Sequence, residues 1–570
     1  MESLPAETNG RAPSLADDPA LGLSPRAKLE ILGAVLLALF LGALDQTIVG
    51  TALPRIVTDL GGNEYYTWVV TIYLLTSTIT VPFYGKLSDL YGRKPMMMIG
   101  VTIFLIGSAL SGLSQNMAML ILFRGIQGIG AGALFPIALA VIGDLYTPAE
   151  RGRYQGLFGA VFGISFIIGP ALGGLLTDNV SWHWIFYVNI PVGIVSLIVL
   201  ARLLPTVKRA GATRNFDIAG AAVFIVAISA LLIGLTNKQS GDWGDLEVGG
   251  LIAASAVLGA VFLAIEARAK EPIIPLGMFR NRTYTASLLS TFLVSFGFFG
   301  AIIFLPRWFQ FVHGSSATES GYQIFPLLIG LIGSSIVSGI LVSKTGRYKL
   351  IILSGLVIMT VGIALMTQLT ATTDITTLWV WMFITGAGIG PTLSVYTIVV
   401  QNAVPFRQLG VATSNLTFFR QIGGSVGLAV TGTIFGSRLV DELPGQLKAA
   451  GVPDQAVTQF SNAGTSALDN LVGVGNDLGT QILAAVPPAF QEAVKPIIPN
   501  IVAGIHGAFT IGVTAAFQIG VVATILAAGT ALFLKEIPLR THTGEAPVPA
   551  PAAAGSESIP TRWTESPTTD

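Results

Sequence analysis

The ten residues Gly85-Lys86-Leu87-Ser88-Asp89-Leu90-Tyr91-Gly92-Arg93-Lys94 join two long apolar runs, and a degenerate copy returns later as Gly339-Ile340-Leu341-Val342-Ser343-Lys344-Thr345-Gly346-Arg347. In both copies a second glycine follows the first after seven residues and arginine comes next, and the offset between the copies is 254 residues. A second repeated stretch, at 128–130 and 388–390, has a similar offset of 260. The chain therefore contains two related halves, an arrangement typical of membrane transporters whose substrate path runs between the repeats.

The composition indicates a membrane protein. Of the 570 residues, 52% are hydrophobic and 11% are charged, whereas a soluble domain is about 25% charged. Cysteine is absent and histidine occurs four times, which excludes disulfides and thiolate sites and leaves no tract for a metal. The net charge is zero, and no phosphate-binding glycine loop or hydrolytic triad is recognisable. We therefore expect no enzyme activity, no cofactor, no metal and no nucleic-acid partner.

Apolar runs long enough to cross a hydrocarbon core of about 30 Å occur throughout the chain. Fourteen are predicted, at residues 30–53, 66–85, 95–114, 117–144, 153–177, 184–204, 216–236, 247–267, 284–306, 321–342, 350–370, 378–400, 411–436 and 507–534. The predicted fold is an all-α membrane protein with two six-helix bundles and two helices inserted between them.

Positive charge is distributed unevenly among the connections between these runs. If both chain ends face the cytoplasm, the inner segments hold 23 Lys and Arg residues and the outer segments hold 6. Because cytoplasmic connections are enriched in Lys and Arg, we expect both termini to be cytoplasmic. The predicted parts are a disordered tail at 1–28, a first bundle at 29–204, a linker with the inserted helices at 205–267, a second bundle at 268–536 and a disordered tail at 537–570.

The second bundle contains one long connection, residues 437–505, which this orientation places outside the cell. It contains Pro, Gly, scattered acidic residues and amphipathic stretches such as 480–503. Such a pattern predicts either a hairpin or helices lying on the membrane surface.

Further motifs follow one another along the chain: LDQTIVGTALP at 44–54, the glycine-rich loop at 85–94, RGIQGIG at 124–130, GPALGG at 169–174 and SWHWIFYVNIPVG at 181–193. Their order and spacing resemble the fourteen-span drug:proton antiporter branch of the major facilitator superfamily. The run RQIGGS at 420–425 is similar to this branch as well, whereas His183 stands where the family usually has arginine. The resemblance covers about residues 30–535 and implies the major facilitator fold.

Asp45 is the residue with the most evident chemistry, because a carboxylate within hydrocarbon must be neutralised, paired or hydrated. It lies about 15 residues into its span, or about 22 Å from the inner face, and Arg124 lies about 10 Å below the outer face. The two charges therefore lie at similar depth, and we hypothesise that they face one cavity. Burial disfavours the carboxylate and a nearby guanidinium favours it, so movement of Arg124 would allow Asp45 to bind and release a proton. The alternative is a static structural ion pair.

The loop at 85–94 has a plain interpretation as a positively charged inner connection. The resemblance adds a conformational latch made by Gly85, Asp89, Gly92 and Arg93, in which Asp89 pairs with basic groups or a helix N-terminus when the inner side is closed.

The fifth predicted span carries small residues at helical spacing and one proline. These are Gly159, Gly163, Gly169, Pro170, Gly173 and Gly174. They predict close helix packing and a kink, and the resemblance identifies them as the antiporter motif that accompanies export. Ser165 occupies one position where the family has glycine.

A substrate cavity for drugs needs apolar, aromatic and a few polar contacts. The candidates for its lining are Tyr73, Phe135, Trp308, Phe309, Tyr396, Phe419 and Arg420. For each aromatic residue the alternative is packing or contact with lipid. Arg420 needs a partner near mid-membrane, and the options are Gln421, Asn415, the backbone or a bound anion.

The resemblance implies a multi-pass protein of a bacterial inner membrane that acts as a monomer, with protons and a drug-like amphipathic molecule as its partners. It implies efflux by alternating access. Two alternatives are an exporter of one endogenous lipid, siderophore or antibiotic, and a sensor or scaffold that has kept the fold without transport. The presence of Asp45, Arg124 and Asp89 argues against the last.

Overall fold

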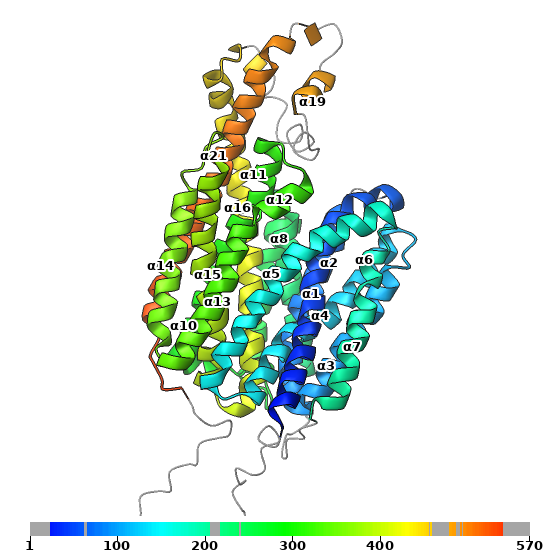
Figure 1. Cartoon of the computed structure of the whole chain (residues 1–570), viewed down its shortest axis with the longest axis vertical. Coiled ribbons are helices and arrows are strands. Elements are labelled where there is room, and N and C mark those ends of the chain that lie inside the picture. Colours follow the sequence, from blue (N-terminus) through cyan, green and yellow to red (C-terminus); the bar gives the residue numbers. More distant parts are fainter. Residues whose placement is uncertain are drawn as a thin grey trace, which may run out of the picture.

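The computed structural model describes residues 23–539 except 62–64, 206–216, 239–240, 455, 459–477, 486–490 and 493. Both predicted tails fall largely outside this part of the chain. Within it the regular structure is helical, with no strand. The two described ends of the chain lie at the same end of the molecule (Figure 1), which we call the basal end, and the opposite end is the apical end.

The first half contains six membrane-length segments. They are α1 (Pro25–Leu60), α2 (Tyr66–Tyr91), α3 (Arg93–Ser111), α4 (Met117–Leu145), α5 (Pro148–Asn179) and the pair α6 (Trp184–Tyr187) and α7 (Asn189–Leu203). The inserted helices are α8 (Ile218–Asn237) and α9 (Leu251–Glu266).

The second half repeats this arrangement with several interruptions. It contains α10 (Arg282–Ile302), α11 (Phe304–His313), α12 (Ala317–Gln323), α13 (Phe325–Thr345), α14 (Tyr348–Met366), α15 (Ile375–Ala403), α16 (Leu409–Ala449), α19 (Leu478–Ala485) and α21 (Ile498–Leu532). In Figure 1 the two halves lie side by side, and α5 of the first half packs against α13 of the second.

Glycine decides the local structure of the repeated loop. Gly92 has φ 100° and Gly346 has φ 69°, a region of backbone space that residues with a Cβ rarely adopt. Gly92 separates α2 from α3, and Gly346 ends α13. The second glycine of each copy of the repeat therefore allows the abrupt reversal between two membrane helices.

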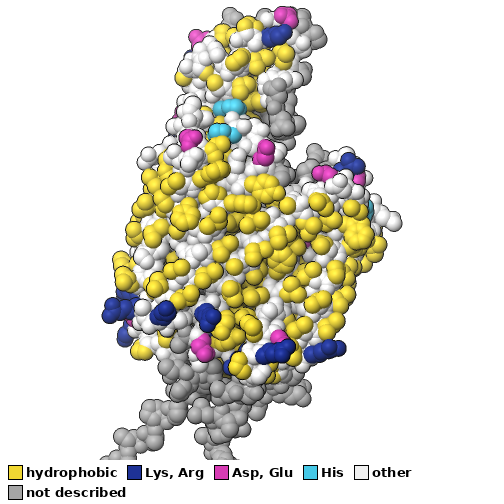
Figure 2. All heavy atoms as spheres, viewed as in Figure 1, with side chains coloured by type: hydrophobic (Ala, Val, Ile, Leu, Met, Phe, Trp, Pro, Cys, Tyr) yellow, Lys and Arg dark blue, Asp and Glu magenta, His cyan; other side chains and the backbone are white. Residues whose placement is uncertain are grey.

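Thirteen helical segments of the described chain are long and apolar enough to span a membrane, and the face of the bundle shown in Figure 2 is largely hydrophobic. The predicted thirteenth span, at 411–436, lies in α16 and is not among these thirteen, although α16 has 41 residues. It packs against α10 and α21 in its own half and against α2 and α4 in the first half. Because protein covers α16 on several sides, it can carry polar residues such as Asn415 and Gln421 without exposing them to lipid.

The helices on either side of the long connection extend beyond the predicted spans. α16 continues to Ala449 and α21 begins at Ile498, whereas the apolar runs predict an end at 436 and a start at 507. The two helices pack along each other, with Leu447 against Gly504, and rise above the rest of the bundle (Figure 1). The described part of 437–505 is therefore a helical projection continuous with two membrane helices.

Candidate functional site

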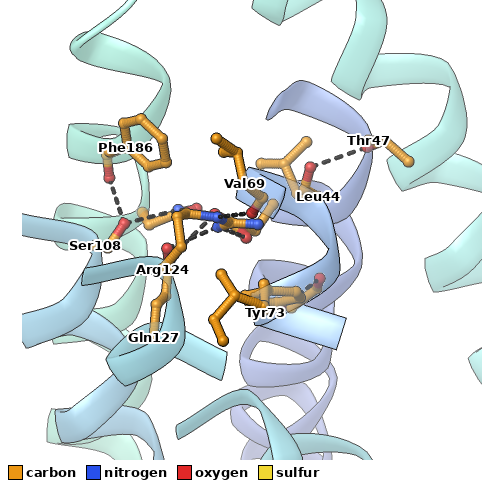
Figure 3. A network of polar contacts seen from close by, with 12 residues as sticks. Leu44, Thr47, Val69, Tyr73, Ser108, Arg124, Gln127 and Phe186 are labelled. Carbon is orange, nitrogen blue, oxygen red and sulfur yellow. Dashed lines mark hydrogen bonds and ion pairs between the residues drawn. The ribbon is translucent and has the colours of Figure 1, made fainter. Parts of the chain in front are cut away.

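The core of the first half contains a buried polar network that includes Arg124 and Gln127 (Figure 3), and both residues bind Asp45. Arg124 Nη1 lies 2.5 Å from Asp45 Oδ2, and Gln127 Nε2 donates to Asp45 Oδ1 at 2.8 Å. Asn189 Nδ2 donates to the same Oδ1 at 3.2 Å. Asp45, Gln127 and Asn189 have no exposed surface and Arg124 is 1% exposed. The carboxylate thus has one charged and two neutral donors in a site closed to water.

Three helices position these groups, because Asp45 lies on α1, Gln127 and Arg124 on α4, and Asn189 at the start of α7. Arg124 and Gln127 are three residues apart and so share one face of α4, and Arg124 Nη1 donates to Gln127 Oε1 at 2.7 Å. Asn189 also donates to Ser108 Oγ of α3, at 3.1 Å. The hydrogen-bond network of Asp45 therefore connects α1, α3, α4 and α7.

Aromatic rings enclose the guanidinium. The Arg124 Cζ atom lies 4.2 Å from the centre of the Tyr73 ring and 5.8 Å from that of Phe186. Tyr73 was expected to line a substrate cavity, but it is 1% exposed and stacks on this ion pair. The rings exclude water and strengthen the attraction between Arg124 and Asp45.

The sequence predicted that Asp45 and Arg124 lie at similar depth, and the structure brings them into direct contact. Gln127 and Asn189 were within the quoted motifs but received no role. The sequence does indicate that these two residues belong to a polar network, because amide side chains inside apolar runs need hydrogen-bond partners.

A second polar cluster joins the two halves at the basal end. Asp89, near the end of α2, accepts hydrogen bonds from the backbone N–H groups of Gly410 (3.1 Å) and Val411 (2.9 Å) at the start of α16. Arg93 Nη1 lies 2.7 Å from Asp89, and Arg93 Nε lies 2.9 Å from Asp144 of α4. A carboxylate at a helix N-terminus satisfies unpaired N–H groups and complements the helix dipole.

Gly85 and Gly410 bring α2 and α16 together beside this cluster. A Cβ built on Gly410 would lie 2.7 Å from the carbonyl oxygen of Gly85, and one built on Gly85 would overlap the side chain of Ser414. Glycine at both positions therefore permits the approach that places Asp89 at the end of α16.

A third basal contact was not predicted. Gln401 of α15 accepts hydrogen bonds at Oε1 from Gln155 Nε2 (3.1 Å) and Arg151 Nη1 (3.4 Å) of α5, and its Nε2 donates to the carbonyl of Leu139 (3.0 Å). Arg151 and Gln401 are 2% and 1% exposed. Their separation of 250 residues explains why no local pattern connected them.

The glycines of α5 face two different helices. A Cβ on Gly159 would meet Ser335 of α13 at 3.0 Å, and one on Gly163 would overlap Ile332 of the same helix. Gly169 and Gly173 instead face Thr47 and Thr51 of α1, while a Cβ on Gly174 would meet nothing within 4 Å. The motif thus packs α5 against both halves.

Pro170 lies inside α5, and near it Ser165 Oγ donates to the Val161 carbonyl at 2.8 Å. Thr47 Oγ1 donates to the Ser165 carbonyl at 3.0 Å. Ser165 is fully buried, so its small side chain permits the close packing of α1 and α5.

The other expected cavity residues divide into two groups. Trp308, Phe309 and Tyr396 have no exposed surface; Trp308 Nε1 donates to Thr510 Oγ1 at 3.0 Å and the Tyr396 hydroxyl donates to Ser290 Oγ. Trp308 and Tyr396 thus form hydrogen bonds between helices of the second half, and Phe309 packs in the hydrophobic core of the same half. Phe135, Phe419 and Arg420 are half-buried.

Comparison with known proteins gives consistent results. Residues 35–428 match the family described as Major Facilitator Superfamily. The multidrug transporter protein MdtP of Bacillus subtilis is 40% identical over 496 residues, covering 86% of this chain and 91% of the relative. Multidrug resistance protein 3 of the same species is 38% identical and covers 74% and 83%.

Two further matches are more distant. The tetracenomycin C resistance and export protein of Streptomyces glaucescens is 31% identical over 554 residues, covering 96% of this chain and 99% of the relative. The crystal structure of the human organic anion transporter MFSD10 (TETRAN) has a TM-score of 0.54 at 16% identity, covering 72% and 94% of the two chains. The latter match shows the shared fold alone.

Proposed function

Because this chain belongs to the major facilitator superfamily and is a multi-pass membrane transporter, we propose that it exports amphipathic, drug-like molecules in exchange for protons. The relatives named for multidrug transport cover most of the chain at 38–40% identity, which supports drugs as substrates. The buried ion pair of Asp45 and Arg124 carries the proposal of proton coupling.

The chemistry of coupling follows from the geometry around Asp45. While Arg124 lies 2.5 Å away, its guanidinium and the amide donors of Gln127 and Asn189 compensate a negative charge on the carboxylate. If α1 and α4 separate, a lone carboxylate in the membrane core is strongly disfavoured and takes up a proton. One rearrangement then binds a proton and the reverse releases it, which is the requirement for an antiporter.

Alternating access is supported by the basal contacts. Asp89 with the start of α16, and Gln401 with α5, link the two halves at the basal end. Lys and Arg side chains gather at this same end (Figure 2), so we propose that the basal end faces the cytoplasm of a bacterial inner membrane, with both termini there. The structure then corresponds to a state closed towards the cytoplasm, and the repeats rock about the buried midplane.

The test is transport by the purified protein in liposomes with an imposed pH gradient. We expect a panel of drugs to move against the proton flow in the wild type, and Asp45→Asn to bind drug without coupled transport. Glu30→Gln, which removes an exposed carboxylate from the same helix, is the matched control. Full proton-driven transport by Asp45→Asn would falsify this role of Asp45.

A narrower substrate range is the second candidate. The tetracenomycin C export protein aligns over nearly the full length of both chains, which favours export of one compound made by the cell. A resistance profile restricted to one chemical class on overexpression would support this candidate, whereas resistance to several unrelated drugs would support the first.

A further inference from the structure

Arg420 lacks a countercharge in the core of the described protein. Three buried cations of the first half instead lie against carboxylates: Arg124 against Asp45, Arg93 against Asp144, and Lys86 against Glu271. Within the described residues, no acceptor takes a hydrogen bond from Arg420, and its Nη2 atom is buried without a partner. A buried guanidinium without an anion is unfavourable, so its persistence suggests that something else supplies the charge.

An aromatic ring of the opposite half lies beside Arg420. Its Cζ atom lies 5.6 Å from the ring centre of Phe135 on α4. Phe135 in turn makes edge contacts with Phe158 and Phe162 of α5, with ring centres 5.9 and 5.5 Å apart. A cation beside one ring of an aromatic cluster fits a ligand that has an anionic group and an aromatic body.

The depth of the pair matches a substrate site. Arg420 lies eleven residues after the start of α16 and Phe135 ten residues before the end of α4, or about 15–17 Å from the basal ends of these helices. That is the middle of a hydrocarbon core of about 30 Å, where transporters of this kind bind substrate between their halves. Arg420 and Phe135 are both half-buried, so packed protein does not cover them completely.

Gln421, the next residue along α16, gives a second unsatisfied group. Its Oε1 atom is buried without a donor among the described residues. A ligand with a hydroxyl or amide N–H beside its anionic group would supply a donor where Gln421 lacks one.

From these observations we propose that Arg420, with Phe135 across the interface, binds the anionic group of the exported molecule, so that the substrate class is amphipathic aromatic organic anions. This inference rests on the proposed export function and specifies its substrate. The planar guanidinium can hold a carboxylate or sulfonate through two parallel hydrogen bonds. Because the ligand would touch α16 and α4 at once, its binding would couple directly to the separation of the halves.

The experiment measures binding of three probes that share one aromatic body: pyrenebutyrate, its neutral amide and the corresponding pyrenebutylammonium. The full chain is placed in nanodiscs of phosphatidylcholine, so that no anionic lipid competes, and calorimetry is corrected with empty nanodiscs. We expect the wild type to bind pyrenebutyrate about tenfold or more tightly than the amide, and Arg420→Gln to lose this preference.

Three variants serve as comparisons. Arg438→Gln removes an exposed charge from the same helix and should change nothing. Arg420→Lys keeps the charge without the planar fork and should retain only part of the preference. Phe135→Leu should weaken all three probes alike. If Arg420→Gln does not fold, Arg420→Lys and Phe135→Leu still test the proposal. The proposal requires Arg420→Lys to reduce the preference for pyrenebutyrate over its amide and Phe135→Leu to leave that preference unchanged.

Equal affinity of the wild type for the three probes, or unchanged pyrenebutyrate binding in folded Arg420→Gln, would overturn the proposal. The same proteins in liposomes with a pH gradient separate the two proposals. Charge-selective binding without export would support the anion site and reject the export function. Export that does not depend on Arg420 would support the export function and reject the anion site.

Discussion

Gly152 of α5 and Gly339 of α13 meet backbone to backbone at the basal end, so that a Cβ on either residue would overlap the other's backbone. Gly85 and Gly410 make the corresponding contact between α2 and α16. The first glycine of each repeat copy, Gly85 or Gly339, thus packs against a helix of the other half. The two basal contacts are reciprocal, as the internal repeat requires.

Enlarging one of these glycines should hold the basal end open. We expect Gly339→Ala to destabilise the closed state by about 1–3 kcal/mol, as overpacking of a tight contact does. The measurement is the distance between spin labels on cysteines introduced at Arg153 and Lys344, which are exposed on α5 and α13. The chain has no cysteine of its own, so the labels need no other change. Gly333→Ala, where a Cβ meets nothing within 4 Å, should leave the distances as in the wild type.

The two copies of the repeat differ in charge at their basal contacts. Asp89 accepts from two N–H groups of α16, whereas its counterpart Ser343 lies against Gly152 and its buried Oγ has no hydrogen-bond partner among the described residues. Asp89→Asn should therefore weaken closure while Ser343→Ala should not. A loss of about 1–2 kcal/mol changes the ratio of closed to open molecules by about five- to thirtyfold, readable with the same labels. Equal effects of the two substitutions would show that the charge of Asp89 is irrelevant to closure.

Gln401 should act as an independent basal contact. Gln401→Leu removes the acceptor used by Arg151 and Gln155 and should favour the open state. Because Gln401 and Asp89 share no partner, their effects on the opening free energy should add within about 0.5 kcal/mol in the double variant. A strongly non-additive result would mean that the two contacts break in sequence.

Loss of Arg124 should be more damaging than loss of both charges. Arg124→Gln leaves Asp45 buried without its cation, and breaking such a pair costs about 3–5 kcal/mol. The double variant Arg124→Gln with Asp45→Asn should recover thermal stability in detergent but no proton-driven transport. If the double variant is less stable than the single one, the pair does not behave as a buried ion pair.

The sequence predicted the pairing of Asp45 with Arg124 because hydropathy marks where each span begins, and the helical rise then gives depth. It did not predict the contact of Gln401 with Arg151, which depends on how two separately folded bundles meet. Aromatic residues in apolar runs, such as Trp308 and Tyr396, were assigned to a cavity because hydropathy does not distinguish lipid, ligand and neighbouring helix.

The sequence also underestimated the length of the helices that form the projection, for a physical reason. An apolar run ends where a helix leaves hydrocarbon, as at residue 436, but backbone hydrogen bonding does not end there. Polar residues continue α16 to Ala449, where Leu447 packs on α21. Hydropathy therefore locates the membrane boundary and not the end of the helix.

The length of α16 connects the basal contact rigidly to the apical projection. One helix runs from Gly410, at the contact with Asp89, to Ala449 in the projection, about 60 Å in all. A tilt that frees its basal end must swing its other end through an arc on the far side of the membrane. If the basal end faces the cytoplasm as proposed, an antibody fragment bound to the projection would block this movement from outside the cell without contacting the interface between the halves.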